Sequence, residues 1–193
     1  MPSLAHLLDD ALDRIAGQRF DPELVRGNVI DLGGPAHRVR GLADRLNALR
    51  DGRPKQAIVL WTTGYSAVTK RGPWVYIARG LVDTLSDDAV AFILAHEMGH
   101  HDLRHLSPTV IIAGLMGEMQ RMEYQADRYA LELARRAGFD PAGALEALSP
   151  TLWGSEPDDA MADWPPRLRQ WVNRFRKSHP PLEARLEALR AAM

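Results

Sequence analysis

The chain has 193 residues, of which 24 are basic and 25 acidic, and it contains no cysteine. This length is sufficient for one domain with a buried core. The formal charge of −1 at pH 7 gives no indication of a nucleic-acid or anionic-membrane partner. Disulfides and thiolate metal ligands are excluded, so a metal would have to be held by histidine and carboxylate side chains.

No apolar run approaches the roughly 18–20 residues that a transmembrane helix needs. The longest extends only from Val110 to Gly117. The first residues also lack the basic start and the apolar centre of an export signal. We therefore expect no transmembrane segment and a cytoplasmic location.

The first 50 residues predict two helices with an irregular stretch between them. Ser3 can cap an amphipathic helix over residues 3–16, which Gly17 ends. Residues 20–35 contain three glycines and two prolines, so we expect irregular structure there. Apolar residues at helical spacing then predict a helix over residues 36–50.

Three short strands are predicted next. Residues 57–61 form a short apolar run that is typical of a strand. Residues 67–69 and 74–78 have the same character, and the glycine and proline within residues 71–73 predict a hairpin between them. These strands predict one small sheet.

Ser86 is the expected N-cap of a further helix, and Asp87 and Asp88 favour its positive N-terminus. One side of this helix is apolar enough to require burial. Its members are Ala89, Phe92, Ile93, His96, Gly99, His100 and Leu103.

The rest of the chain predicts three helices and a long loop. The first helix follows Ser107 and Pro108 and runs to Gly138, and the second is short and spans residues 140–148. Residues 149–181 are rich in proline and have little periodicity, so we expect a loop. The last helix covers residues 181–193.

The segment His96-Glu97-Met98-Gly99-His100 is an H-E-x-x-H motif inside the helix that follows Ser86. Residues four apart lie on one helix face, so the two imidazoles can bind one zinc ion. Glu97 is rotated by about 100° from His96. Its carboxylate can therefore lie beside the metal and take a proton from water, as in a zinc peptidase.

A catalytic zinc needs a third protein ligand, and Glu123 is the best candidate. It shares one face of the next long helix with Asp127, Ala130 and Ala134, and the small alanines allow a close approach to the motif helix. Asp127 can then support a ligand histidine from behind. The alternative is a solvated Glu/Asp pair on an exposed helix.

Two more histidines follow the motif directly. On a continuous helix His101 lies about 140° and His105 about 180° from His96. Neither can then share a metal with His96 and His100, and we expect both at the surface.

Residues 178–185, Ser-His-Pro-Pro-Leu-Glu-Ala-Arg, form a second signal. Prolines are common at a helix start, which accounts for the two prolines but not for His179. Arg185 lies one and a half turns into the predicted helix.

These segments together resemble the M48 family of zinc metallopeptidases over residues 36–192. The resemblance rests on residues 85–100, on residues 123–141 and on residues 178–185. It implies that His96, His100 and Glu123 bind one zinc ion per chain and that Glu97 is the general base. It further implies a pair between Asp127 and Arg185 behind the site, and a role for His179 in stabilising the oxyanion or contacting the substrate.

The resemblance also implies an edge strand on which an extended peptide substrate lies, formed by Trp74, Val75, Tyr76, Ile77 and Ala78. Ser66-Ala67 stands where family members commonly have an Asn-Ala pair, so the substrate contact at this position is a departure from the family. The implied fold is α+β, a mainly helical zincin-like domain with a small sheet whose edge strand flanks the active-site cleft.

We expect one metallopeptidase domain over residues 1–193. Residues 1–35 would precede a catalytic core at 36–148, followed by a mobile loop or lid at 149–178 and the C-terminal motif and helix at 179–193. A nucleic-acid patch and a membrane-surface role are weaker interpretations of the loop, whose Trp153, Trp164 and Trp171 accompany several arginines. We favour the lid because the loop leads directly to His179.

The predicted function is hydrolysis of peptide bonds in a peptide or unfolded protein by zinc-activated water. One alternative is a regulatory metallopeptidase with the same motif that cleaves a repressor. Another is a non-catalytic module that keeps zinc for structure, although such a closed site has no use for a base at Glu97.

Overall fold

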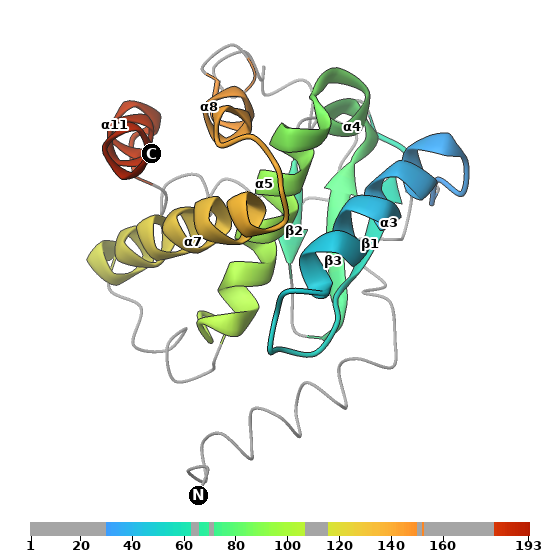
Figure 1. The fold of residues 1–193 in the computed structure, drawn as a ribbon, viewed down its shortest axis with the longest axis horizontal. Helices are drawn as coiled ribbons and strands as arrows, with labels where there is room; N and C mark the ends of the chain where they lie inside the picture. The colour runs from blue at the N-terminus through green and yellow to red at the C-terminus, as the bar shows by residue number, and fades with distance from the viewer. Residues whose placement is uncertain (1–29, 63–65, 70–71, 107–115, 150–151, 153–179) are drawn as a thin grey trace, which may run out of the picture.

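The computed structural model describes residues 30–62, 66–69, 72–106, 116–149, 152 and 180–193 (Figure 1). The predicted helix over residues 3–16, residues 153–178 of the predicted lid and His179 lie outside this part of the chain. In chain order the elements are α3 Gly34–Asn47, β1 Gln56–Leu60, β2 Ala67–Thr69, β3 Trp74–Ala78, α4 Arg79–Thr84, α5 Asp87–Asp102, α7 Met116–Arg136, α8 Ala142–Ala147 and α11 Leu182–Ala192.

The sheet has three strands in the order β1-β3-β2. β2 and β3 form the predicted hairpin, with Val68 opposite Tyr76, and β1 runs parallel to β3. Successive side chains of a strand point to opposite faces. Val75 and Ile77 belong to the main core beneath the helices, whereas Tyr76 packs with Leu60 and Val68 in a second, smaller cluster.

The position of β3 in the sheet differs from the expectation for Trp74–Ala78. All five of its residues pair with β1, and Val75, Tyr76 and Ile77 also pair with β2. β3 is therefore the central strand and not an edge strand. The hairpin could be read from the sequence, but the side on which β1 joins it could not. Among the described strands β2 has one neighbour, and it packs on α5.

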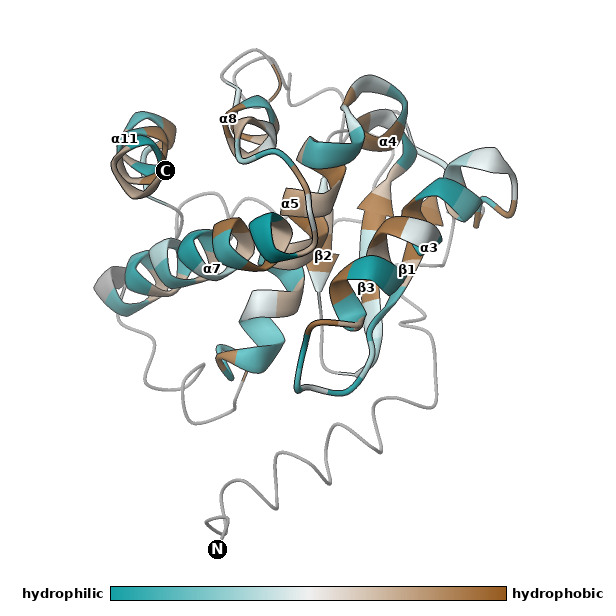
Figure 2. Cartoon of the chain, viewed as in Figure 1, coloured by the Kyte–Doolittle hydropathy of each residue, from teal (hydrophilic) through white to brown (hydrophobic). Residues whose placement is uncertain are grey.

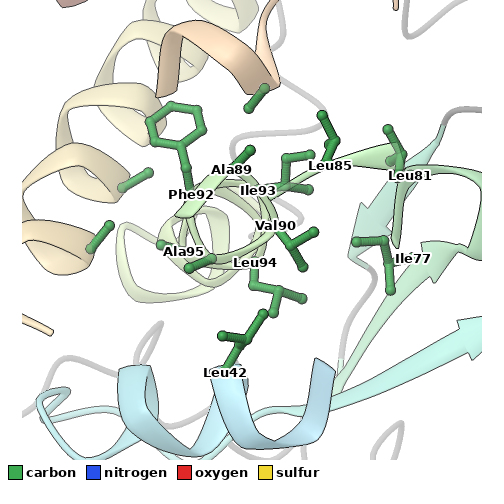
Figure 3. Close-up of a cluster of buried hydrophobic side chains, with 14 of the residues drawn as sticks. Leu42, Ile77, Leu81, Leu85, Ala89, Val90, Phe92, Ile93, Leu94 and Ala95 are labelled. Atoms are coloured by element: carbon green, nitrogen blue, oxygen red, sulfur yellow. The ribbon is translucent and has the colours of Figure 1, made fainter. Parts of the chain in front are cut away.

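α5 is the central helix of the domain. Every residue from Ala89 to His100 is buried, because α3 and the sheet cover one side while α7 and α8 cover the other (Figure 1). Figure 3 shows Leu42 of α3 facing Leu94, and Phe92 pointing to the opposite side. The sequence predicted burial of one side only, and it included Leu103, which is 41% exposed.

Two glycines set how closely the helices approach α5. A Cβ on Gly99 would lie 2.9 Å from Cδ1 of Tyr129 on α7. A Cβ on Gly143 of α8 would lie 2.5 Å from the backbone carbon of Asp88. Neither distance is sterically possible, so glycine is required for this packing. The face of α7 toward α5 also carries small side chains, because Ala126 and Ala130 lie there, completely buried.

The sequence analysis predicted no element between the third strand and Ser86, but the short helix α4 lies there. Ala78, still in an extended conformation, is its N-cap. Its Leu81 and Val82 are buried in the core. Six residues are too few to display helical periodicity, which explains the omission.

Hydropathy follows this arrangement. Hydrophobic residues dominate the strands, while hydrophilic and hydrophobic residues alternate along α3 and α7 (Figure 2). Such alternation is typical of helices that bury one face against a core. Within the described ranges, no helix has both the length and the apolar character needed to cross a membrane.

We expect Leu94→Ala to lower the free energy of unfolding by about 2–5 kcal/mol, because it removes a completely buried side chain at the centre of the core. Leu32→Ala is the matched control, since Leu32 is 76% exposed. Urea denaturation of both variants measures the effect. Equal losses in the two variants would contradict the central role of α5 in the core.

Candidate metal centre

Three buried side chains from two helices meet at one point. α5 provides His96 and His100, one turn apart, and α7 provides Glu123. The two Nε2 atoms are 3.1 Å apart. Glu123 Oε2 lies 3.4 Å from Nε2 of His96, and Glu123 Oε1 lies 3.4 Å from Nε2 of His100.

These distances can be compared with those around a bound metal. Four ligand atoms in a tetrahedron about zinc, each about 2.0–2.2 Å from it, are about 3.3–3.6 Å from one another. The Nε2 atoms of His96 and His100 are 3.1 Å apart, and each lies 3.4 Å from a different oxygen of the Glu123 carboxylate, so these spacings are close to those between the ligands of one metal ion. Two imidazole nitrogens and a carboxylate are also a ligand set that zinc accepts. The three residues therefore fit a tetrahedral metal ion with a fourth position left for another ligand.

Behind His96 lies a buried chain of charged groups. His96 Nδ1 is 2.9 Å from Asp127 Oδ1. Arg185 of α11 donates two hydrogen bonds to Asp127, of 2.8 Å from Nε and 2.6 Å from Nη2. The structure thus brings Asp127 and Arg185 together and connects them to the candidate metal ligand His96. An outer carboxylate of this kind fixes the orientation and the tautomer of a ligating histidine.

The charges of this chain shift the pKa values of its members. Burial would lower the pKa of His96, but Asp127 and Glu123 outweigh it and raise the pKa to about 10. Burial likewise opposes ionisation of Asp127, yet Arg185 and His96 lower its pKa. The carboxylates around His96 therefore strongly favour the protonated, positively charged form of its imidazole.

Glu97 is buried on α5 between the two histidines, with 5% of its surface exposed. The carboxylates of Asp127, Glu123 and Glu97 all raise the pKa of Arg185, against the effect of burial. Glu97 is therefore within electrostatic reach of the same guanidinium that holds Asp127.

His105 is not the surface residue that the sequence suggested, and His101 is only partly exposed. α5 ends at Asp102, so an angle calculated for a continuous helix does not apply to His105. His105 is 8% exposed, and its Nδ1 lies 3.1 Å from Nδ1 of His100. Burial lowers the pKa of His105. His101 is partly buried and is hydrogen-bonded to Thr69 of β2. The spacing of His96, His100 and His105 in the sequence was the signal that could have indicated the position of His105 beside His100.

The end of α5 is held by an ion pair that sequence reasoning missed. Arg50 donates two hydrogen bonds to Asp102, of 2.8 Å from Nε and 2.6 Å from Nη2. Tyr129 of α7 donates a third to the same carboxylate. Burial and Asp102 raise the pKa of Tyr129 to about 12. This cluster joins α5, α7 and the segment after α3. The residues of this cluster are far apart in the sequence, so no local sequence pattern indicates it.

Comparison with known proteins agrees with this arrangement. The family model for peptidase family M48 matches residues 38–122 and 108–193. The chain belongs to peptidase family M48. This membership classes it as a metallopeptidase, a hydrolase, and His96, His100 and Glu123 are its candidate metal-ligand group.

Two relatives can be named. Metalloprotease LoiP from Escherichia coli (strain K12) is 25% identical, and the match covers 56% of this chain and 56% of LoiP. The crystal structure of S. mikatae Ste24p matches with a TM-score of 0.53 and 18% identity, covering 95% of this chain and 55% of that one. The second likeness shows a Ste24-like zincin fold. The chain spans little more than half the length of either relative.

We expect Arg185→Met to lower stability by about 3–5 kcal/mol, because it leaves the Asp127 charge buried without its guanidinium. Addition of Asp127→Asn should recover part of this loss, with a coupling of about 0.5–3 kcal/mol in a double-mutant cycle. Urea denaturation of the metal-free protein measures all four species.

The control cycle uses Arg135 and Glu132, whose side chains are 2.8 Å apart but 65% and 54% exposed. Its coupling should not exceed about 1 kcal/mol. A coupling in the Asp127–Arg185 cycle no larger than this control would show that burial does not strengthen the pair.

Proposed function

We propose that this chain is a zinc-dependent endopeptidase that acts on peptides or unfolded proteins. The observation that carries the proposal is the buried group of His96, His100 and Glu123, in which the two Nε2 atoms are 3.1 Å apart and each is 3.4 Å from a Glu123 oxygen, spacings close to those of a tetrahedral zinc site. Membership in peptidase family M48 and the likeness to metalloprotease LoiP support it.

Zinc held there would supply Lewis acidity, which acidifies water and polarises a peptide carbonyl. The chain supplies the proton transfer. Glu97 follows His96 directly on α5 and is buried beside the ligands. Its carboxylate would accept the proton of the attacking water and then give it to the leaving amine. His179, outside the described residues, is proposed to stabilise the oxyanion or contact the substrate.

An extended substrate would lie along β2 rather than along the central strand β3. Peptides commonly add as a further strand to a free sheet edge. β2 has such an edge among the described strands, and the hydrogen bond between Thr69 and His101 joins it to the end of the motif helix. Backbone pairing with Ala67–Thr69 would recognise an extended chain with little dependence on its sequence.

The two alternatives make different demands on the site. A structural zinc site is closed by four protein ligands, whereas the described residues offer a group of three. A carboxylate at Glu97, next to a candidate ligand, is also suited to proton transfer, for which a closed structural site has no need. A repressor-cleaving enzyme would share this chemistry and differ in its substrate, so tests on a general substrate and on specific candidates distinguish it.

We expect the 193-residue chain to bind one zinc ion, and His100→Ala to lose it, because a ligand nitrogen is removed. His37→Ala is the control, since His37 is exposed on α3. Elemental analysis after dialysis gives the zinc content of each protein. Full zinc occupancy in His100→Ala would refute the proposed ligand set.

We expect Glu97→Gln to retain zinc and to reduce casein cleavage by about 10²–10⁴-fold, since the amide fills the same space but cannot accept a proton. Glu118→Gln should leave cleavage unchanged, because the Glu118 side chain is 48% exposed on α7. Zinc content and proteolysis are measured on the same samples. Wild-type proteolysis in Glu97→Gln would show that another group is the base.

A further inference from the structure

The backbone turns sharply where α5 ends. The N–H of Arg104 donates to the carbonyl of His101, and the N–H of His105 donates to the carbonyl of His100, at 3.0 and 2.9 Å. This pair of bonds is the Schellman motif. It places the side chain of His105, the second residue after the helix cap, against His100, which lies five positions earlier. An apolar contact usually occupies this place, but here it holds two imidazole rings.

The turn has an energetic cost in this sequence. Arg104 adopts φ 61°, a left-handed conformation that a residue with a Cβ takes up rarely. α7 ends with the same two bonds, from Gly138 to Arg135 and from Phe139 to Ala134. There the left-handed position, at φ 78°, is a glycine. The chain thus accepts strain at Arg104 in a turn that brings His105 back to the metal centre.

His105 meets His100 on the side away from the metal-ligand group. The two Nδ1 atoms are 3.1 Å apart, and His105 is buried with 8% exposed. On its other side, Nε2 of His105 lies 3.2 Å from Oε1 of Gln125 on α7. His105 therefore spans the gap between His100 and α7.

These contacts determine where the protons are. Nε2 of His100 belongs to the metal-ligand group, so its single proton must be on Nδ1. Nδ1 of His105 must then accept a hydrogen bond, and its own proton is on Nε2. That N–H faces a carbonyl oxygen, Gln125 Oε1, as the assignment requires. The contacts agree with a single tautomer for each ring.

We propose that His105 is a positioning residue that holds His100, through its Nδ1, in the tautomer and orientation needed to bind the metal. The inference rests on the proposed function, because it takes His100 as a metal ligand. Gln125 acts one step further out, by keeping the proton of His105 on Nε2. His105 itself touches neither metal nor substrate.

The test compares the zinc affinity of variants of the 193-residue chain by competition with a chelating dye. His105→Phe fills the space without an acceptor and should weaken zinc binding about 10–100-fold. His105→Asn can place Oδ1 where Nδ1 was and should restore most of the affinity. Gln125→Leu leaves His105 in place and should cause a smaller loss. His37→Phe, at an exposed site, should cause none.

A second readout is nitrogen-15 NMR of the imidazoles in the zinc-loaded protein. Wild type should show His105 protonated on Nε2 alone, and Gln125→Leu should show a mixture of tautomers. Protonation of His105 on Nδ1 in the wild type would overturn the inference. Equal losses in His105→Phe and His105→Asn would overturn it too, because shape and not the acceptor would then matter.

Failure of this inference and failure of the proposed function give different results. If the wild type binds no zinc, or if His100→Ala binds it as tightly, both are refuted. If the wild type binds zinc through His100 and His105→Phe binds it equally well, the positioning role alone is refuted.

Discussion

The close contact between α5 and α7 is the constraint on which the centre depends. Glu123 can complete the metal-ligand group with the two histidines only if the helix axes approach more closely than large side chains allow. Gly99, one residue before His100, faces the ring of Tyr129, where a Cβ would be 2.9 Å away. Ala126 and Ala130 supply the small surface on α7. The residues that shape the site are thus mainly those that contribute no functional group.

Burial of so many charges is tolerable only because they compensate one another. Glu97, Glu123 and Asp127 are buried together with a single guanidinium, that of Arg185. With every carboxylate ionised, the formal charge of these four residues is −2, which a divalent cation would neutralise. The pKa of His96 is raised to about 10 for the same reason, because the neighbouring carboxylates stabilise a positive charge there. Zinc binding at this centre should therefore release a proton from His96.

The sequence correctly predicted those structural features that are determined by a local pattern of residues. Ser86 caps α5 through its hydroxyl, as predicted. The hairpin of β2 and β3 and the end of α7 near Gly138 also follow from nearby residues. The face of α7 that carries Glu123 and Asp127 could be read from helical spacing, and both residues are buried.

Features that depend on distant partners were not predicted. Nothing near β1 indicates on which side of the hairpin it pairs, so β3 was assigned to the edge. Arg50 and Asp102 are separated by 52 positions, and their pairing is visible only in three dimensions. His105 was misplaced because its position depends on where α5 ends, and a left-handed arginine is an unusual end for a helix.

The two candidate histidine ligands are supported by groups of different charge, and the charge balance explains why. His96 is backed by the ionised pair of Asp127 and Arg185, while His100 is backed by the neutral His105 and Gln125. A second carboxylate behind His100 would take the buried charge beyond what one divalent ion can neutralise, at a large desolvation cost. An imidazole that accepts one hydrogen bond satisfies His100 without adding charge. The strain at Arg104 is the smaller cost, because it is confined to one backbone torsion in a turn.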